Sequence, residues 1–270
     1  MSSDGARAPR ILIDRTHGGR VANVVLNRPE LRNAFDDRLI EEASDVFQGL
    51  AFEPGVRVVV LSGAGKSFCA GADLNWMGRM AGYSLEENAR DSAALAALFQ
   101  IVNECPRPVV ARIHGAALGG GTGLAAVADI VIAAEGTLFG TTEVRLGILP
   151  AVISPYVVRK IGESNARLWF LTGERFDARE AQRAGLVHRV VPEAELDTAV
   201  EAVVGSLLLG GPEALAEAKH LARTMGSLSF DAAIPLSITK ISERRVSPEG
   251  QEGMSAFLGK RRASWTSAEA

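Results

Sequence analysis

The 270-residue chain has little of what cross-links, metal clusters or membrane-spanning segments need. It contains only 2 cysteines, Cys69 and Cys105, and they match no paired-cysteine motif. We therefore expect neither a disulfide framework nor a zinc cluster, and we expect a reducing, cytoplasmic location. The 4 histidines are scattered and suggest no metal-ligand cluster or Ser-His-Asp arrangement, so no metal is expected. No apolar run approaches the ~20 residues that a membrane span requires.

The chain also lacks an excess of positive charge. Its 29 Lys and Arg residues face 32 Asp and Glu residues, which gives a net charge of -3 and a pI of about 5.9. Affinity for nucleic acid or anionic membranes rests on clustered cations, and only residues 244–245 and 260–262 form short basic clusters. We therefore expect no nucleic-acid or membrane partner. Residues 1–9 contain no apolar segment, so a secretory signal is not expected either.

What the chain does have is two glycine-bearing turns that lie far apart in the sequence. Residues 69–73 read Cys-Ala-Gly-Ala-Asp, and residues 118–123 read Leu-Gly-Gly-Gly-Thr-Gly. Each turn follows a run typical of a buried strand and precedes a helix-like stretch. A strand that passes through small residues into a helix start points free N–H groups into a cleft. Two such turns facing one another would form a two-donor oxyanion hole, with the N–H of Gly120 as one donor.

Each turn also has an interpretation without a ligand. The first could be a tight strand-to-helix connection in which Asp73 caps the helix. In the second, each glycine costs roughly 0.5–1 kcal/mol relative to alanine, and close packing of another backbone would offset that cost as well as a ligand would. The second turn is not a G-x-G-x-x-G fingerprint, and residues 63–67 lack the spacer of a Walker loop.

One carboxylate is placed where it could serve such a cleft. Glu143 follows a short strand-like run at residues 138–140 and precedes Gly147. It could act there as a general acid or base. The alternative is a surface ion pair with Arg145, two residues further on, which is the usual role of a glutamate.

The order of elements predicts an α/β protein with a mostly parallel sheet. Residues 11–13 and 21–26 read as strands joined by the Gly18–Gly19 turn, and residues 35–50 carry helical spacing before the next strand at 56–61. This alternation implies βαβ crossovers. Further strands are expected at residues 109–113, 130–133, 138–140 and 187–191, and further helices at residues 84–103, from 154 onward, 193–209, 212–225, 230–245 and 248–258.

Several motifs, in this order along the chain, resemble the enoyl-CoA hydratase/isomerase (crotonase) superfamily. They are residues 27–29, 68–73, 114–121, 139–150 and 248–258. The resemblance runs from about residue 11 to about residue 265. It implies a ββα spiral core, assigned here to residues 10–192, and a C-terminal helical region at residues 193–265. That region implies a homotrimer or a dimer of trimers.

The resemblance also implies an acyl-CoA substrate, with coenzyme A as part of the substrate and no separate cofactor. The thioester oxygen would accept hydrogen bonds from the N–H groups of Ala70 and Gly120. The remaining residues carried over for the substrate or coenzyme A are Lys66, Gly71, Ala72, Asp73, Gly119 and, from a neighbouring subunit, Lys260. Trp76 and Met77 would line the acyl pocket, although such side chains are more often plain core.

One position departs from the family pattern. Hydratases that resemble this chain usually carry two catalytic glutamates, but the first position is Gly123 here, which leaves Glu143 alone. Glu143 could position water and shuttle the proton by itself. A single glutamate also resembles the Δ3,Δ2-enoyl-CoA isomerases, which move a proton without adding water.

Finer motifs resemble bacterial methylglutaconyl-CoA hydratases, whose glycine turn likewise tends to lack the first glutamate. They lie at residues 73–77, 143–147, 153–157 and 171–177. The implied reaction converts methylglutaconyl-CoA to 3-hydroxy-3-methylglutaryl-CoA in leucine breakdown, and a close relative hydrates isohexenylglutaconyl-CoA. A distal carboxylate would need a partner, for which Arg79, Tyr83 and Arg145 are candidates. One eukaryotic relative binds RNA, but the charge of this chain disfavours that alternative.

Overall fold

The computed structural model describes residues 8–266, and its main element is a six-stranded sheet with the order β1-β2-β3-β4-β6-β9. The first seven residues, which belong to the segment expected to hold no secretory signal, lie outside the described residues. The strands of this sheet are β1 (Ile11–Thr16), β2 (Val21–Leu26), β3 (Val58–Gly63), β4 (Val109–Ile113), β6 (Ile130–Ala134) and β9 (Arg189–Val191). The expected hairpin is confirmed, because β1 and β2 are antiparallel with Ile11 opposite Leu26. All other neighbours in this sheet are parallel, as the crossovers predict.

A second sheet of three short strands lies above the first. Its strands are β5 (Ala116–Leu118), β7 (Leu138–Gly140) and β8 (Arg175–Asp177), in the order β5-β7-β8. The sequence predicts β7 but misses β5 and β8, and residues 175–177 lie in a stretch expected to be helical. A strand of three residues is too short to show an alternating pattern, so no periodicity marks it.

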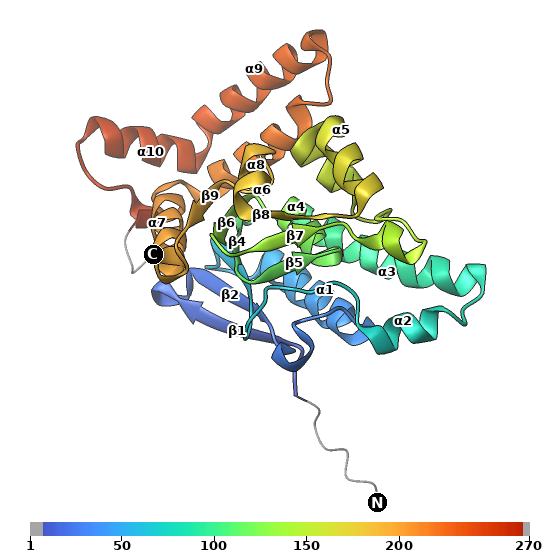
Figure 1. Ribbon diagram of the computed structural model, residues 1–270. Helices are drawn as coiled ribbons and strands as arrows, with labels where there is room; N and C mark the ends of the chain where they lie inside the picture. The colour runs from blue at the N-terminus through green and yellow to red at the C-terminus, as the bar shows by residue number, and fades with distance from the viewer. Residues whose placement is uncertain (1–7, 267–270) are drawn as a thin grey trace, which may run out of the picture.

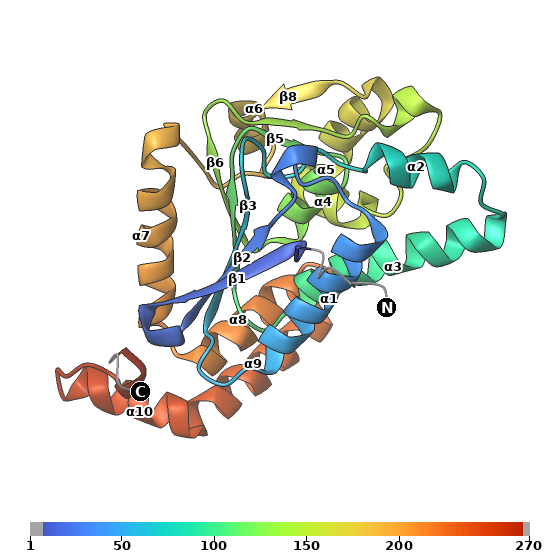
Figure 2. The same ribbon diagram turned by 90° about the horizontal axis from the view of Figure 1, so that it is seen from below.

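Helices cover both faces of the large sheet (Figure 2). On one face lie α1 (Asp37–Phe52) and α3 (Leu85–Glu104), whose buried residues join the main core. On the other face lies α7 (Leu196–Leu209), where Val200 and Val204 pack with Val58 and Val110 of the sheet. The sequence assigns α7 to the C-terminal helical region, but the structure makes it part of the core. The core therefore extends to residue 209.

The remaining helices complete the site and the C-terminal region. They are α2 (Leu74–Met80), α4 (Gly120–Val127), α5 (Ser154–Thr172) and α6 (Ala178–Arg183). The C-terminal region consists of α8 (Pro212–Met225), α9 (Phe230–Val246) and α10 (Pro248–Leu258). Figure 1 shows α9 and α10 reaching away from the two sheets, on the far side of the molecule from α2.

Two further expectations bear on the class of protein. Within residues 8–266, no group of three or more His, Cys, Asp or Glu side chains could hold a metal ion, and both cysteines are buried free thiols. No single described helix is long and apolar enough for a membrane span. One bent pair, 193–209 with 212–225, reaches that length and composition across an angle of 107°.

Candidate active site

The two glycine-bearing turns meet, although nearly fifty residues separate them. The N–H of Cys69 donates to Ala116 O at 2.9 Å, and the N–H of Leu118 donates to Cys69 O at 2.9 Å. This pairing places the first turn alongside β5, which runs into α4 at Gly120. The prediction that the two turns face one another is thus confirmed.

Packing explains why the second turn is built of glycine. A Cβ on Gly121 would lie 2.4 Å from Cys69 O, and one on Gly120 would lie 2.6 Å from Cε2 of Phe35. Gly119 has φ +51° and ψ -117°, a conformation that other residues rarely adopt. Close approach of another chain segment therefore requires these glycines, and the same approach brings their backbone to the cleft.

One of the two predicted N–H donors is not available in the structure. The sequence predicts Ala70 as a donor, but the N–H of Ala70 already donates to Arg32 O at 2.9 Å. The N–H of Phe35 donates to Gly71 O, and the N–H of Asp73 donates to Phe35 O. In this extended pairing the residue between them, Ala72, faces away from Phe35, so its N–H points to the opposite side. Within residues 8–266 that N–H has no acceptor. Ala72 therefore replaces Ala70 as the first donor.

The second predicted donor agrees with the structure. Gly120 is the first residue of α4, where an N–H has no partner inside the helix. Ala72 and Gly120 both line the same cavity. Their two N–H groups, added to the positive end of the α4 dipole, favour an oxygen that carries negative charge.

Asp73 has a structural role at the start of α2. Its carboxylate caps α2 by accepting from the N–H groups of Asn75 and Trp76, and it pairs with the buried Arg28 at 2.7 Å. Burial raises the pKa of Asp73, but the hydrogen bonds from Arg28 and from the two N–H groups outweigh it and hold the pKa below its usual value. The expected cap is confirmed. Asp73 does not line the cavity, and its expected contact with coenzyme A stays a prediction.

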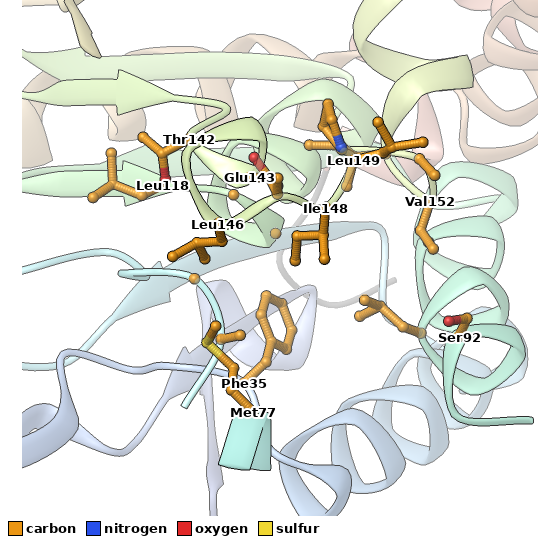
Figure 3. Close-up of a pocket in the computed structure, with 18 of the residues that line it drawn as sticks. Phe35, Met77, Ser92, Leu118, Thr142, Glu143, Leu146, Ile148, Leu149 and Val152 are labelled. Carbon is orange, nitrogen blue, oxygen red and sulfur yellow. The ribbon is translucent and has the colours of Figure 1, made fainter. Parts of the chain in front are cut away.

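The cavity beside the two turns has a volume of about 290 Å³ and a mostly apolar wall. Figure 3 shows Phe35 and Met77 on one side of it and Glu143, Leu146 and Ile148 on the other. Of the predicted site residues, the structure brings eight to this cavity. They are Ala70, Gly71, Ala72, Trp76, Met77, Gly119, Gly120 and Glu143.

Glu143 has the environment of an acid–base group. It begins a 3-10 helix, Glu143–Leu146, directly after β7, and its Oε1 lies 3.2 Å from where a Cβ on Gly119 would stand. Its Oε2 is buried with no hydrogen-bond partner among the described residues. Burial raises the pKa of Glu143, with a weaker opposing effect from its own N–H. The alternative ion pair is wrong, because the Nε of Arg145 donates to Thr172 O instead.

Comparison with known proteins shows the family of the chain. The family model described as enoyl-CoA hydratase/isomerase matches residues 16–268. The chain belongs to the enoyl-CoA hydratase/isomerase family. It is therefore an enzyme of the enoyl-CoA hydratase type, and the expected crotonase fold is confirmed.

Relatives of this family cover nearly the whole chain. A putative enoyl-CoA hydratase of Thermus thermophilus is 36% identical over 243 residues, which is 90% of this chain and 96% of that protein. A crystal structure of a putative enoyl-CoA hydratase/isomerase (crotonase) from Legionella pneumophila has a TM-score of 0.90 and 39% identity, over 96% of this chain and 100% of that one. Pseudomonas aeruginosa AtuE has a TM-score of 0.91 and 37% identity, over 96% and 100%.

The glycine that departs from the family pattern leaves no room for a second glutamate. Gly123 is buried in α4, and a Cβ there would lie 2.3 Å from Cγ2 of Ile153 and 2.9 Å from Cζ of Phe99. Two hydrophobic side chains therefore occupy the place next to Gly123. Glu143 faces the glycine turns without a second acidic group from α4.

Besides Asp73, five residues suggested by the sequence are absent from the cavity wall. Lys66 and Lys260 are exposed and do not line the cavity of this chain. The contact of Lys260 with a neighbouring subunit stays a prediction. None of the three candidates for a distal carboxylate lines the cavity, and Arg79 pairs with Asp37 at 3.1 Å.

The structure adds wall residues to which the sequence assigns no role in the pocket. Residues 146–153 supply one wall, and Asp91, Ser92 and Leu95 of α3 supply another. The sequence of residues 146–150 could have predicted this wall, because Leu146, Ile148 and Leu149 follow neither a helical nor a strand period. Such unpatterned apolar residues in a loop mark a surface that contacts something other than the core.

Proposed function

We propose that this enzyme adds water to the double bond of 2-enoyl-CoA thioesters, with Glu143 as its sole acid–base carboxylate. The observation that carries the proposal is one cavity holding the free N–H groups of Ala72 and Gly120 together with the buried carboxylate of Glu143. Two N–H donors and one carboxylate are what an enolate-like intermediate of a thioester requires.

The reaction follows from this geometry in two proton transfers. The thioester oxygen accepts hydrogen bonds from Ala72 and Gly120, so that charge gathers on that oxygen when a nucleophile attacks C3. Glu143 takes one proton from water, and the resulting hydroxide oxygen bonds to C3. Glu143 then returns the proton to C2, which consumes one water and leaves the carboxylate ionised. The same steps in reverse remove water from the 3-hydroxyacyl thioester.

For the acyl group we propose methylglutaconyl-CoA, which would give 3-hydroxy-3-methylglutaryl-CoA. The motifs at residues 73–77 and 153–157 support this choice, and both supply the cavity wall. The apolar side chains of Phe35 and Ile148 suit the methyl branch, and the hydroxyls of Ser92 and Thr142 are available to a distal carboxylate. Isohexenylglutaconyl-CoA is the alternative, because its longer apolar arm also suits this wall.

A second candidate is a Δ3,Δ2-enoyl-CoA isomerase. The observation that favours it is the packing around Gly123, since moving a proton between two carbons needs only one carboxylate. Hydratase and isomerase differ in the fate of water oxygen. Incubation of 2-enoyl- and 3-enoyl-CoA in oxygen-18 water, with mass spectrometry of the products, separates them.

The decisive experiment combines that label with a Glu143→Gln variant. We expect oxygen-18 in the 3-hydroxyacyl product of the wild type, and a fall in kcat of roughly 10²–10⁴-fold in the variant. Binding of coenzyme A should persist in the variant, because no N–H donor is changed. Near-normal turnover by Glu143→Gln would contradict the role of Glu143. Double-bond migration without label would instead favour the isomerase.

We further propose that the chain works as a homotrimer or as a dimer of trimers. Large apolar side chains of α9 and α10 are exposed, among them Phe230 and Phe257 at 84% and 83%. Exposed apolar side chains in this number are typical of an interface. Light scattering should give three or six times the 28.5 kDa of one chain, and a monomer at micromolar concentration would contradict the proposal.

A further inference from the structure

One side-chain hydrogen bond crosses the wall of the acyl cavity. The indole Nε1 of Trp76, on α2, donates to Oδ1 of Asp91, on α3, at 3.1 Å. Both residues line the cavity, and Trp76 is only 3% exposed. The bond therefore ties the two helices together at the surface that an acyl chain would meet.

The bond lies away from the reacting end of the cavity. Phe99, on α3, packs against Gly123 close to the glycine turns. Asp91 precedes Phe99 by eight residues on the same helix, which is about 12 Å along its axis. Its neighbour Ser92 accordingly lies far from Leu118 and Thr142 in Figure 3. An acyl chain held by its thioester at the turns would reach Trp76 and Asp91 only with its distal carbons.

The bond is also one of the polar attachments of a short helix, beside the ion pair of Arg79 with Asp37. The helix α2 has 7 residues, too few to be stable alone, so it depends on what holds it. Asp73 fixes its start through Arg28, and the Trp76 bond fixes the side that faces the cavity. Asp91 forms no ion pair with a cation among the described residues, and the indole of Trp76 is its partner across the cavity wall.

We propose that the Trp76–Asp91 hydrogen bond sets the length of acyl chain that the cavity admits. It holds the indole against α3, where it blocks the distal end of the cavity. Without the bond, α2 can move away from α3 at this point, and the cavity lengthens while the two N–H donors and Glu143 stay in place. Asp91 is thus a positioning residue that acts through Trp76. The effect of chain length on binding is independent of the reaction, whereas its effect on turnover rests on the proposed function.

The test measures binding of saturated acyl-CoAs from butyryl- to dodecanoyl-CoA by calorimetry, so that it needs no turnover. Each methylene that enters the cavity should tighten binding about fourfold, until the chain meets Trp76 and the affinity reaches a plateau. We expect Trp76→Phe and Asp91→Ala to move that plateau to longer chains by two carbons or more. The affinity of each variant for butyryl-CoA is the reference from which its own plateau is measured.

Two controls separate positioning from a general loss of structure. Asp91→Asn keeps an oxygen that accepts from the indole, so its plateau should match the wild type. Trp265→Phe removes another indole bond of 3.1 Å, to Leu209 O, far from the cavity, and should also leave the plateau unchanged. A plateau that stays fixed in both Trp76→Phe and Asp91→Ala would overturn the inference. So would a shift in Asp91→Asn as large as in Asp91→Ala.

The outcome is independent of the proposed reaction. If Trp76→Phe and Asp91→Ala move the plateau but the wild type hydrates neither crotonyl-CoA nor methylglutaconyl-CoA, the proposed function is contradicted and the length-setting bond is supported. A wild type that hydrates crotonyl-CoA but binds longer and longer acyl chains without a plateau would support the proposed function and contradict the length-setting bond.

Discussion

Installing the missing glutamate, by Gly123→Glu, should damage the enzyme rather than improve it. The new Cβ would stand 2.3 Å from Ile153 and 2.9 Å from Phe99, well inside van der Waals contact. Phe99 is fully buried and Ile153 is 3% exposed, so neither side chain can retreat into solvent. The added carboxylate would enter this apolar packing without a cation to meet it.

The expected cost can be divided into two steps. The first added carbon overpacks the core by about 1–3 kcal/mol, which the better helix propensity of a residue with a Cβ offsets by about 1 kcal/mol. The carboxylate adds about 3–5 kcal/mol, the size seen when a buried charge lacks a partner. Gly123→Ala, as the matched control, carries only the first step and should lose about 0–2 kcal/mol.

Both variants are measured by urea unfolding and by hydration of crotonyl-CoA. We expect Gly123→Glu to lower the free energy of unfolding by several kcal/mol relative to Gly123→Ala, with no gain in kcat. The reasoning would be refuted by a Gly123→Glu enzyme of wild-type stability that hydrates faster. That result would mean that Ile153 and Phe99 rearrange readily, and that the site accepts two acids.

Three further predictions concern the residues around the donors. Burial raises the pKa of Glu143, and its ionised form must accept the first proton. The value of kcat/KM should therefore fall as the pH drops through an apparent pKa above 4.5. The Glu143→Gln variant should lose this acidic limb of the pH profile. Arg28→Met leaves Asp73 buried without its cation and should cost about 3–5 kcal/mol on denaturant unfolding, whereas a loss below about 1 kcal/mol would show the pair to be dispensable. Gly119→Ala strains a backbone of φ +51° and pushes on Glu143, so kcat should fall by about tenfold or more in steady-state assays while the fold survives; an unchanged kcat would place Glu143 elsewhere during turnover.

Much of the scaffold is visible in the sequence because it rests on local patterns. The strand β4 and the helices α8 and α10 begin and end where hydrophobic runs and prolines predict. The capping box of Ser84 and Glu87 is present at the start of α3. The short strands β5 and β8 cannot be predicted from the sequence, because their pairing with neighbouring strands, rather than their own residues, makes them strands.

The site is visible only in part, for a similar reason. The sequence locates both glycine turns, yet it cannot tell that the N–H of Ala70 is already used by Arg32, because that bond depends on a loop far away in the chain. It also cannot show that Ile153 fills the space beside Gly123. Local composition marks where backbone comes close, and tertiary contacts decide which groups remain free.

The pairing of Cys69 with Ala116 and Leu118 has a consequence for how such an enzyme can diversify. The distance between the two donors is fixed by main-chain bonds, which substitutions elsewhere leave untouched. The acyl wall, by contrast, is made of side chains from α2, α3 and the loop at residues 146–153. New substrates can therefore arise by exchange of wall residues, while the hold on the thioester oxygen is inherited unchanged.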